Sequence, residues 1–324
     1  MAAIPKTAYA ATQPADAPAS AADRAALARA AVRAVAYGDV FDYPLTAAEV
    51  HRYLVGVAAT PAEVHALLRD PATRPAAIAT YDGYFMLRGR EGIVATRRRR
   101  AALAAQVWPR AVRYGRAIAR LPFVRMVGIT GELAMNSVDD GADIDYLIVT
   151  EPGRLWLCRA LIIGIVRLAR HGGDIICPNY LLSERALVLH ERNLYTAHEM
   201  TQMVPLSGLE IYARLRRLND WTARFLPNAE GPPSLVTTDV PVHAVARVLA
   251  EAPLRSPAGE RLERWERGRK IRRLSQAHGP GGEAAFSADW CKGHFDGHGR
   301  RTLAAYAERL RALDLLDADE GWGT

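Results

Sequence analysis

The sequence predicts an α+β protein, with a small mixed sheet near the middle of the chain and mainly helical regions on both sides. Three β-prone apolar runs, at 124–130, 144–149 and 175–182, alternate with helical segments. Both flanking regions instead repeat apolar residues at helical spacing. The length of 324 residues is enough for two or three domains.

The pattern divides the chain into five segments. They are a disordered tail (1–20), a helical unit with a hairpin (21–100), a helical linker (101–123), the central sheet domain (124–205) and a helical C-terminal domain (206–324). The tail lacks the basic start and apolar run of a signal peptide. The most apolar stretch, Leu155–Ala169, contains Arg159 and Arg167 and is shorter than the ~20 residues of a membrane span. It therefore predicts a buried helix and no membrane partner.

Composition gives a weaker indication of function. Half of the residues are apolar and 24% are charged, which is typical of a soluble globular protein. The 42 basic and 35 acidic residues leave a net charge of +7, which suits an anionic partner such as a nucleotide or a nucleic acid. Three widely separated cysteines without CxxC spacing argue against a disulfide framework and against a structural zinc site. They predict a reducing, cytoplasmic compartment.

Residues 21–100 have the pattern of a winged helix-turn-helix. Helical spacing runs from Ala21 to Tyr37, and two capping boxes, Thr46–Glu49 and Thr60–Glu63, open two short helices. Two β-prone runs joined by Asp82-Gly83 then predict a hairpin, because that turn requires positive φ at both central residues.

Such a unit binds nucleic acid or a protein partner, and the sequence leaves both possibilities open. In a nucleic-acid complex the 60–69 helix would enter a major groove. Its exposed face is mixed in charge, with Glu63, His65, Arg69 and Asp70. That face attracts phosphate little, which favours a structural or partner-binding role. The run Arg97–Arg100 either contacts nucleic acid or a nucleotide, or is the solvated start of the next helix.

The rest of the chain alternates between strands and helices and then becomes mainly helical. A long helix over 101–120 is expected to bend or break at Pro109. The central domain has the order strand, helix, strand, helix, strand, at 124–130, 132–137, 144–149, 155–170 and 175–182. After Ser183 helices dominate, with breaks at Pro205, 227–233 and 279–282 and a final helix at 302–315. Core or interhelix contacts are expected for Trp156, Trp221 and Trp265.

Asp143 and Asp145, which open the second central strand, are the residues most informative about chemistry. Side chains two residues apart on a strand share a face, so these carboxylates lie about 7 Å apart along the strand. Two such charges repel each other unless a cation lies between them. Mg²⁺, or Mn²⁺, suits the pair when substrate phosphates complete the coordination shell. An isolated Asp-x-Asp is more often only the polar start of a strand, but together with the surrounding strands and glycine turn the pair predicts a catalytic metal site.

A glycine turn precedes this strand. Gly131 lies between the first strand and a short helix, whose N-terminal N–H groups are a natural seat for phosphate. We expect the triphosphate of a nucleotide to be bound by Thr130, Gly131, Glu132 and Asn136. Metal beside phosphate is the arrangement that phosphoryl and nucleotidyl transfer require.

The succession of strand, glycine turn, helix, polar loop, Asp-x-Asp and strand over residues 127–149 resembles the DNA polymerase beta-like nucleotidyltransferase superfamily. A looser resemblance extends through the strand that ends at Ser183. The chain is also similar to bacterial nucleotidyltransferase-domain proteins in which a winged helix precedes the core. The resemblance implies a small mixed-sheet nucleotidyltransferase core that moves an NMP from an NTP to an acceptor, with Mg²⁺ as cofactor. It leaves open whether the acceptor is a small molecule, an RNA or a protein.

The chain departs from the superfamily pattern at two positions. Ser or Gly usually follows the turn glycine, whereas this chain has Glu132, whose charge opposes a triphosphate. The third carboxylate of the superfamily lies on the next core strand, where this chain has Asn179. An amide ligates a metal but cannot act as a base. Asp174, just before that strand, is the predicted substitute, and Asn179 is the other candidate for the acceptor side.

A polar cluster near the C-terminus supplies further candidates. Phosphate or substrate contacts are expected from Lys292, His294, His298 and Arg300, with Arg154 as a secondary phosphate ligand. The two histidines are also spaced for a transition metal on a helix, but the intervening glycines disfavour a helix there. A solvated basic turn is the alternative. Packing roles are expected for His190, His198 and Glu199.

Three functions follow from these patterns. The first is an enzyme that transfers an NMP from an NTP. The second is a catalytically degenerate nucleotide sensor or scaffold, which Glu132 and Asn179 favour. The third, supported only by the N-terminal unit and the basic charge, is a winged-helix regulator that binds nucleic acid.

Overall fold

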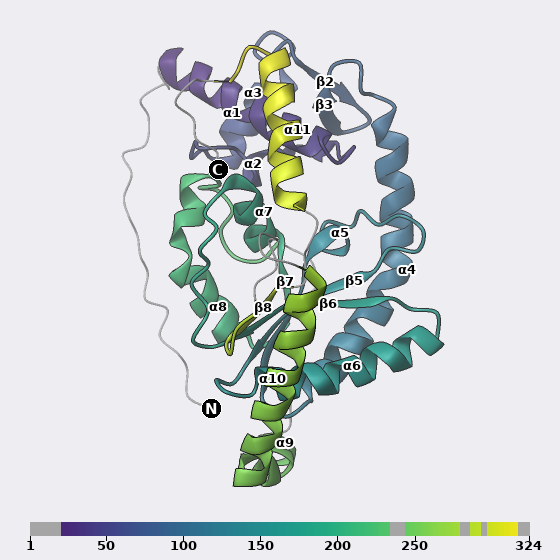
Figure 1. The fold of residues 1–324 in the computed structure, drawn as a ribbon. Helices are drawn as coiled ribbons and strands as arrows, with labels where there is room; N and C mark the ends of the chain where they lie inside the picture. Colours follow the sequence, from purple (N-terminus) through teal and green to yellow (C-terminus); the bar gives the residue numbers. More distant parts are fainter. Residues whose placement is uncertain (1–20, 234–243, 279–285, 293–296, 317–324) are drawn as a thin grey trace, which may run out of the picture.

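The structure, a computed structural model, describes residues 21–233, 244–278, 286–292 and 297–316 (Figure 1). It confirms the α+β class, with helices packed around a three-stranded and a five-stranded sheet in the described part of the chain. The predicted disordered tail and His294 lie outside the described residues.

The N-terminal unit consists of three helices and a three-stranded antiparallel sheet. Its elements are α1 (Ala21–Asp39), β1 (Leu45–Thr46), α2 (Ala47–Arg52), α3 (Pro61–Arg69), β2 (Ile78–Tyr81) and β3 (Tyr84–Leu87). Both capping boxes are confirmed, since Thr46 and Thr60 exchange hydrogen bonds of 2.7–3.2 Å with the glutamates three residues later. The hairpin is confirmed as well, and both residues of its Asp82-Gly83 turn have positive φ.

The long helix α4 (Ile93–Ala119) begins earlier than predicted and continues through Pro109 without a break. Packing explains its continuity, because Ala104, Ala111 and Ile118 on one side of α4 are buried in the central core. The Tyr146 hydroxyl also donates a 2.6 Å hydrogen bond to the Ala111 carbonyl. Burial of this side of α4 thus offsets the loss of the backbone hydrogen bond that proline removes.

The central sheet has the strand order β7-β4-β5-β6-β8. Its strands are β4 (Val124–Ile129), β5 (Ile144–Thr150), β6 (Ile176–Ser183), β7 (Val204–Ser207) and β8 (Trp290–Lys292). The parallel pair is β5 and β6, and the other neighbours are antiparallel. The three central strands were predicted, but β7 and β8 lie where the sequence predicted only helices and breaks. Strands of three or four residues are too short to show a period, and Pro205 is accommodated on an edge strand.

The remaining helices pack around this sheet and against the N-terminal unit (Figure 1). They are α5 (Gly131–Ala134), α6 (Leu155–His171), α7 (Leu194–Gln202), α8 (Leu209–Leu218), α9 (Ala244–Glu251), α10 (Pro257–His278) and α11 (His298–Ala312), with short 3-10 segments at Asp220–Arg224 and Ala252–Arg255. No helix in the described ranges combines the length and apolar character needed to cross a bilayer. The predicted final helix begins at His298, four residues earlier than expected.

Alternate residues of β5 enter two different cores. Tyr146 and Ile148 pack with α4 and α6, whereas Leu147 and Val149 pack with α7, α8 and α11. Because the side-chain period is two, Asp143 and Asp145 share the second face. That face is also where α1 of the N-terminal unit joins the core, since Ala36 and Tyr37 belong to the same cluster.

Candidate metal site and adjoining pocket

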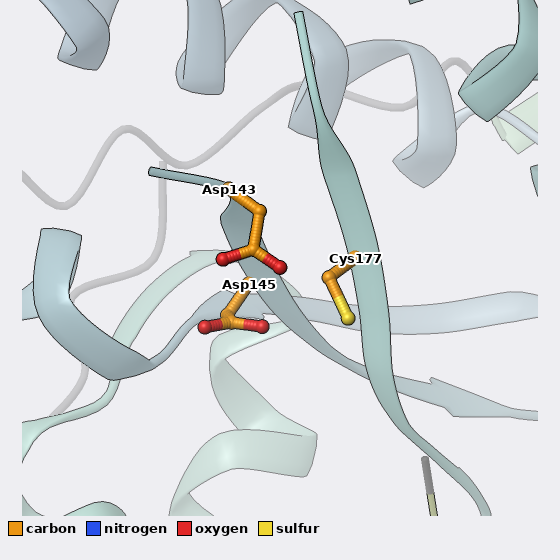
Figure 2. A group of neighbouring side chains, drawn as sticks. All are labelled: Asp143, Asp145 and Cys177. Atoms are coloured by element: carbon orange, nitrogen blue, oxygen red, sulfur yellow. The ribbon is translucent and has the colours of Figure 1, made fainter. Parts of the chain in front are cut away.

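The Asp143 and Asp145 carboxylates lie side by side at the beginning of β5, with the Cys177 thiol of β6 beside them (Figure 2). One ligand atom of each of the three side chains lies within 4.8 Å of the other two. The predicted proximity of the two aspartates is therefore present. The separation of these atoms suits a shared cation, because two carboxylate oxygens are the ligands that a hard divalent ion prefers.

The position of Cys177 follows from strand register. Asp145 pairs with Cys177 across the parallel strands, and an irregularity in the pairing follows directly after them. Burial, together with the charges of the neighbouring aspartates, raises the pKa of the Cys177 thiol. A neutral thiol is a weak ligand for a hard cation, so the sulfur adds affinity mainly for softer ions. The sequence provided no local signal for this role, because it depends on which residue of β6 pairs with Asp145.

Electrostatics also indicate that a cation would stabilise the pair. Burial, followed by the charges of Asp143 and Glu199, raises the pKa of Asp145 to about 8. Without a cation, the protonated form of this side chain is therefore favoured near neutral pH. A divalent ion offsets the same repulsion and favours the carboxylate. The donor set thus fits a divalent metal through its two aspartates.

Gly131 lies directly against Asp145. Its φ is +66°, and a Cβ atom there would be 2.5 Å from the Asp145 Oδ2 atom. The Thr130 N–H donates a 3.1 Å hydrogen bond to the Asp145 carbonyl, which holds the turn to the strand. The helix α5 that follows is a single turn, shorter than predicted, so its dipole contributes little to any phosphate binding.

A pocket of about 430 Å³ opens beside the aspartates. The core contributes Gly131, Glu132, Met135, Ser137, Asp143, Asp145, Tyr195, His198, Glu199 and Gln202 to its wall. The N-terminal unit contributes Ala34, Tyr37, Gly38, Val40, Phe41, Asp42, Tyr43, Leu45 and Tyr53, and Arg100, His298 and Arg301 complete it. Ten of these 22 lining residues thus come from the first hundred residues, which the sequence assigned to a separate domain.

Two pocket residues of α7, His198 and Glu199, were expected only to pack. His198 does pack, since its ring is stacked on Tyr37 at 3.8 Å between centroids. Its Nε2 atom is nevertheless buried without a hydrogen-bond partner among the described residues. Burial lowers the pKa of His198 to about 3 and raises that of Glu199 to about 7, the latter against the opposing charge of Lys292. The pocket therefore holds a neutral imidazole and an acid that titrates near neutrality.

Asp174, Asn179 and Asn136 do not line the pocket. Asp174 accepts hydrogen bonds from Arg110 at 2.6 Å and the Tyr114 hydroxyl at 2.7 Å, beside a separate cavity of about 270 Å³. Asn179 is buried within β6. Asn136 accepts a 2.6 Å hydrogen bond from the Trp108 indole of α4.

The basic residues that were predicted to contact phosphate do not all lie at the pocket. Arg154 follows the far end of β5, and the five residues that follow Asp145 in the strand span about 17 Å. Lys292 forms bonds of 2.7 and 2.8 Å with the Glu191 carboxylate. His298 lines the pocket, whereas Arg300 does not.

All four residues of the Arg97–Arg100 run are paired with carboxylates. Arg97 contacts Glu49, Arg98 contacts Asp82, and Arg99 and Arg100 both contact Asp139. Arg100 also donates a 2.8 Å hydrogen bond to the Phe41 carbonyl. The run thus links the N-terminal unit to the loop before β5, and Arg100 lines the pocket.

Comparison of the chain with protein-family models, with curated proteins and with solved structures finds no match.

Proposed function

We propose that the protein is a Mg²⁺-dependent nucleotidyltransferase, built from a winged-helix unit and a nucleotidyltransferase core, that moves an NMP from an NTP to an acceptor. One observation carries the proposal. Asp143 and Asp145 converge at the wall of a ligand-sized pocket, directly against a glycine turn. The cytoplasmic location expected from the cysteines is part of the same proposal.

In this proposal the side chains of Asp143 and Asp145 hold the metal. A bound Mg²⁺ supplies charge neutralisation and orientation for the transferring phosphoryl group. The turn at Thr130 and Gly131 leaves room for phosphate beside the aspartates, because it carries no bulky side chain at its closest point. Glu132, whose side chain is exposed at the pocket rim, works against phosphate unless it joins the metal shell.

The N-terminal unit has a different role in this proposal from that of a duplex-binding domain. Tyr37, Phe41, Tyr43 and Tyr53 line one side of the pocket. We propose that this aromatic wall contacts the nucleoside or the acceptor, because aromatic rings pack well against the flat, partly apolar parts of such ligands. The exposed face of α3 remains mixed in charge, which disfavours groove binding.

Calorimetry with each NTP, with and without Mg²⁺, tests the proposal. We expect binding that requires the metal, and a loss of at least about 100-fold in affinity for Asp143→Asn and Asp145→Asn, because each removes a charged ligand. Asp140→Asn is the matched control, since this exposed aspartate of the same loop does not line the pocket. Metal-independent binding, or equal losses in all three variants, contradicts the metal site.

A second candidate is a nucleotide sensor or scaffold without catalysis. The lack of a third carboxylate beside the two aspartates favours this candidate. The neighbour of Asp145 on β6 is Cys177, which is a thiol, and Asp174 is paired with Arg110 outside the pocket. Incubation with labelled NTPs and cell extract separates the two functions. Transfer of label to any acceptor supports the enzyme, whereas metal-dependent binding without transfer supports the sensor.

A further inference from the structure

The helix α10 carries a concentration of positive charge on its solvent side. Residues 257–274 of this helix contain seven basic and three acidic side chains. Two of the acids face the protein. Glu263 accepts hydrogen bonds from the backbone N–H groups of Trp156 and Leu157, and Glu266 is buried and paired with Arg269 at 2.5 Å. That pair is the one salt bridge found on α10 among the described residues, so six of the seven basic side chains form no salt bridge there.

Four residues form a single stripe along the outer side of α10. Arg261, Trp265, Gly268 and Arg272 are spaced by four, three and four residues, which places them on one face of a helix. Trp265 is 60% exposed, although the sequence predicted a core or interhelix contact for it. Its neighbour Arg264 is also exposed.

Gly268 lies at the centre of this stripe. A glycine inside a helix costs about 1 kcal/mol relative to alanine, so its presence there calls for a reason. A Cβ atom at this position would meet no atom within 4 Å, so neighbouring packing does not require the glycine. Because Gly268 has no side chain, a ligand can approach the helix backbone closely at the position between the Trp265 indole and the Arg272 guanidinium.

Positive charge extends from α10 onto the neighbouring helix α6, on which it packs (Figure 1). The pKa of Lys270 is lowered, first by burial and next by the positive charge of Arg159 on α6. Lys270 lies on the side of α10 that faces α6, and its charge adds to the positive potential around the helix that attracts a polyanion.

The composition of the stripe discriminates between polyanions. A helix that lies on a membrane needs a continuous apolar face, and among the residues of α10 whose exposure is described the exposed large apolar side chains are Leu262 and Trp265. Arginines around a single exposed indole match a single-stranded nucleic acid, in which phosphates and unstacked bases alternate. We propose that the α10 stripe binds single-stranded nucleic acid, with phosphates on Arg261, Arg264 and Arg272 and a base stacked on Trp265. This inference does not depend on the Asp143–Asp145 site.

Fluorescence anisotropy with a labelled single-stranded RNA of about 16 nucleotides tests the proposal on the full chain. The triple variant Arg261→Glu, Arg264→Glu, Arg272→Glu is expected to lose at least about 100-fold in affinity. Each phosphate contact with a single strand contributes about 0.7 to the slope of log K against log salt, so the slope should fall by about 2 in this variant.

The matched control reverses three exposed arginines on other helices, Arg29, Arg116 and Arg217, which gives the same change in net charge. Trp265→Ala should weaken binding about tenfold, whereas Trp265→Phe should retain most of the affinity because the ring remains available for stacking. Circular dichroism and the thermal midpoint establish that every variant is folded.

Each outcome decides for or against the stripe. Loss in the α10 variant with little loss in the control supports it. Equal losses in both triple variants show attraction by overall charge and overturn the assignment to α10. Absence of RNA binding by the wild type at about 50 mM salt, or stronger binding to anionic phospholipid vesicles than to RNA, also overturns it. Unchanged RNA affinity of the Trp265→Ala variant would show that no base stacks on Trp265.

Discussion

Gly131 is the residue at which the backbone and the candidate metal ligands come closest. Its positive φ disfavours any side chain, and a Cβ atom would overlap the Asp145 carboxylate. The first effect costs about 1 kcal/mol or more of stability, whereas the second displaces a candidate metal ligand. These two effects can be separated, because Gly141, in the loop between α5 and β5, has a similar φ of +76° with open space around it.

Gly131→Ala is therefore expected to weaken metal-dependent NTP binding at least tenfold, while Gly141→Ala lowers only the stability. Calorimetry measures the first property and chemical denaturation the second. If both variants bind NTP as the wild type does, the turn does not determine the position of Asp145.

Cys177 is the residue that distinguishes this site from a set of three carboxylates. Cys177→Asp adds a third carboxyl group beside the two aspartates, so the metal-free variant should be less stable than the wild type by about 1 kcal/mol or more. Mg²⁺ should then raise its thermal midpoint more than that of the wild type, because binding to the folded state stabilises it. Cys177→Ser, which adds no charge, serves as the control. An equal response to Mg²⁺ in all three proteins would show that position 177 does not face the ion.

At the scale of elements, the end of α9 is attached to β4 through one buried carboxylate. Glu251 accepts hydrogen bonds from the Phe123 N–H at 2.9 Å, from Arg125 at 2.8 Å and from Arg255 at 2.8 Å. Burial alone raises the pKa of Glu251, but these hydrogen bonds outweigh it and lower the pKa to about 2. The ionised carboxylate therefore stabilises the folded chain.

Glu251→Gln should lower the free energy of unfolding at neutral pH by about 2 kcal/mol. The folded pKa lies below the unfolded value of about 4.3, so the stabilisation is complete above that value and is lost as the pH falls toward 2. Urea denaturation between neutral and acidic pH should show the difference between wild type and variant shrinking over this window. A difference that is independent of pH would assign the effect to packing.

At the scale of the whole molecule, the N-terminal unit is joined firmly to the core. The Asp39 carboxylate at the end of α1 accepts hydrogen bonds from Arg90 at 2.8 Å and from Arg309 of α11 at 2.7 Å. The Tyr43 hydroxyl donates a 2.8 Å hydrogen bond to the Met135 carbonyl beside the candidate site. The pocket wall thus depends on contacts between segments as much as 270 residues apart in sequence.

Phe41→Ala tests whether the N-terminal unit contributes to ligand binding. Phe41 is 36% exposed at the pocket wall, so its loss should weaken NTP binding about tenfold with little change in stability. Tyr81→Ala is the matched control, because Tyr81 is a 57% exposed aromatic residue of the same unit outside the pocket. Equal NTP affinities in both variants would show that Phe41 does not contact the nucleotide. The aromatic wall would then be assigned to the acceptor.

Local patterns were the part of the fold that could be predicted. The capping boxes at Thr46 and Thr60 and the hairpin turn at Asp82-Gly83 depend on residues within a few positions of one another. The edge strand β8 could not be predicted, because three residues show no period and its pairing partner Tyr180 lies more than a hundred positions earlier. For the same reason, the sequence proposed Asp174 and Asn179 for the site, whereas strand register brings Cys177 there.

By itself, the sequence determined the α+β class, the common face of Asp143 and Asp145 and the glycine turn before them, since each follows from chain periodicity or backbone conformation over a few residues. Tertiary structure alone decided which side chains surround the pair. The pairing of β5 with β6, and the packing of α1 and α7 on one sheet face, brought Cys177, Tyr37, His198 and Glu199 to it. Such neighbours are selected by burial of apolar surface and by strand pairing over long separations, and neither leaves a pattern in adjacent residues.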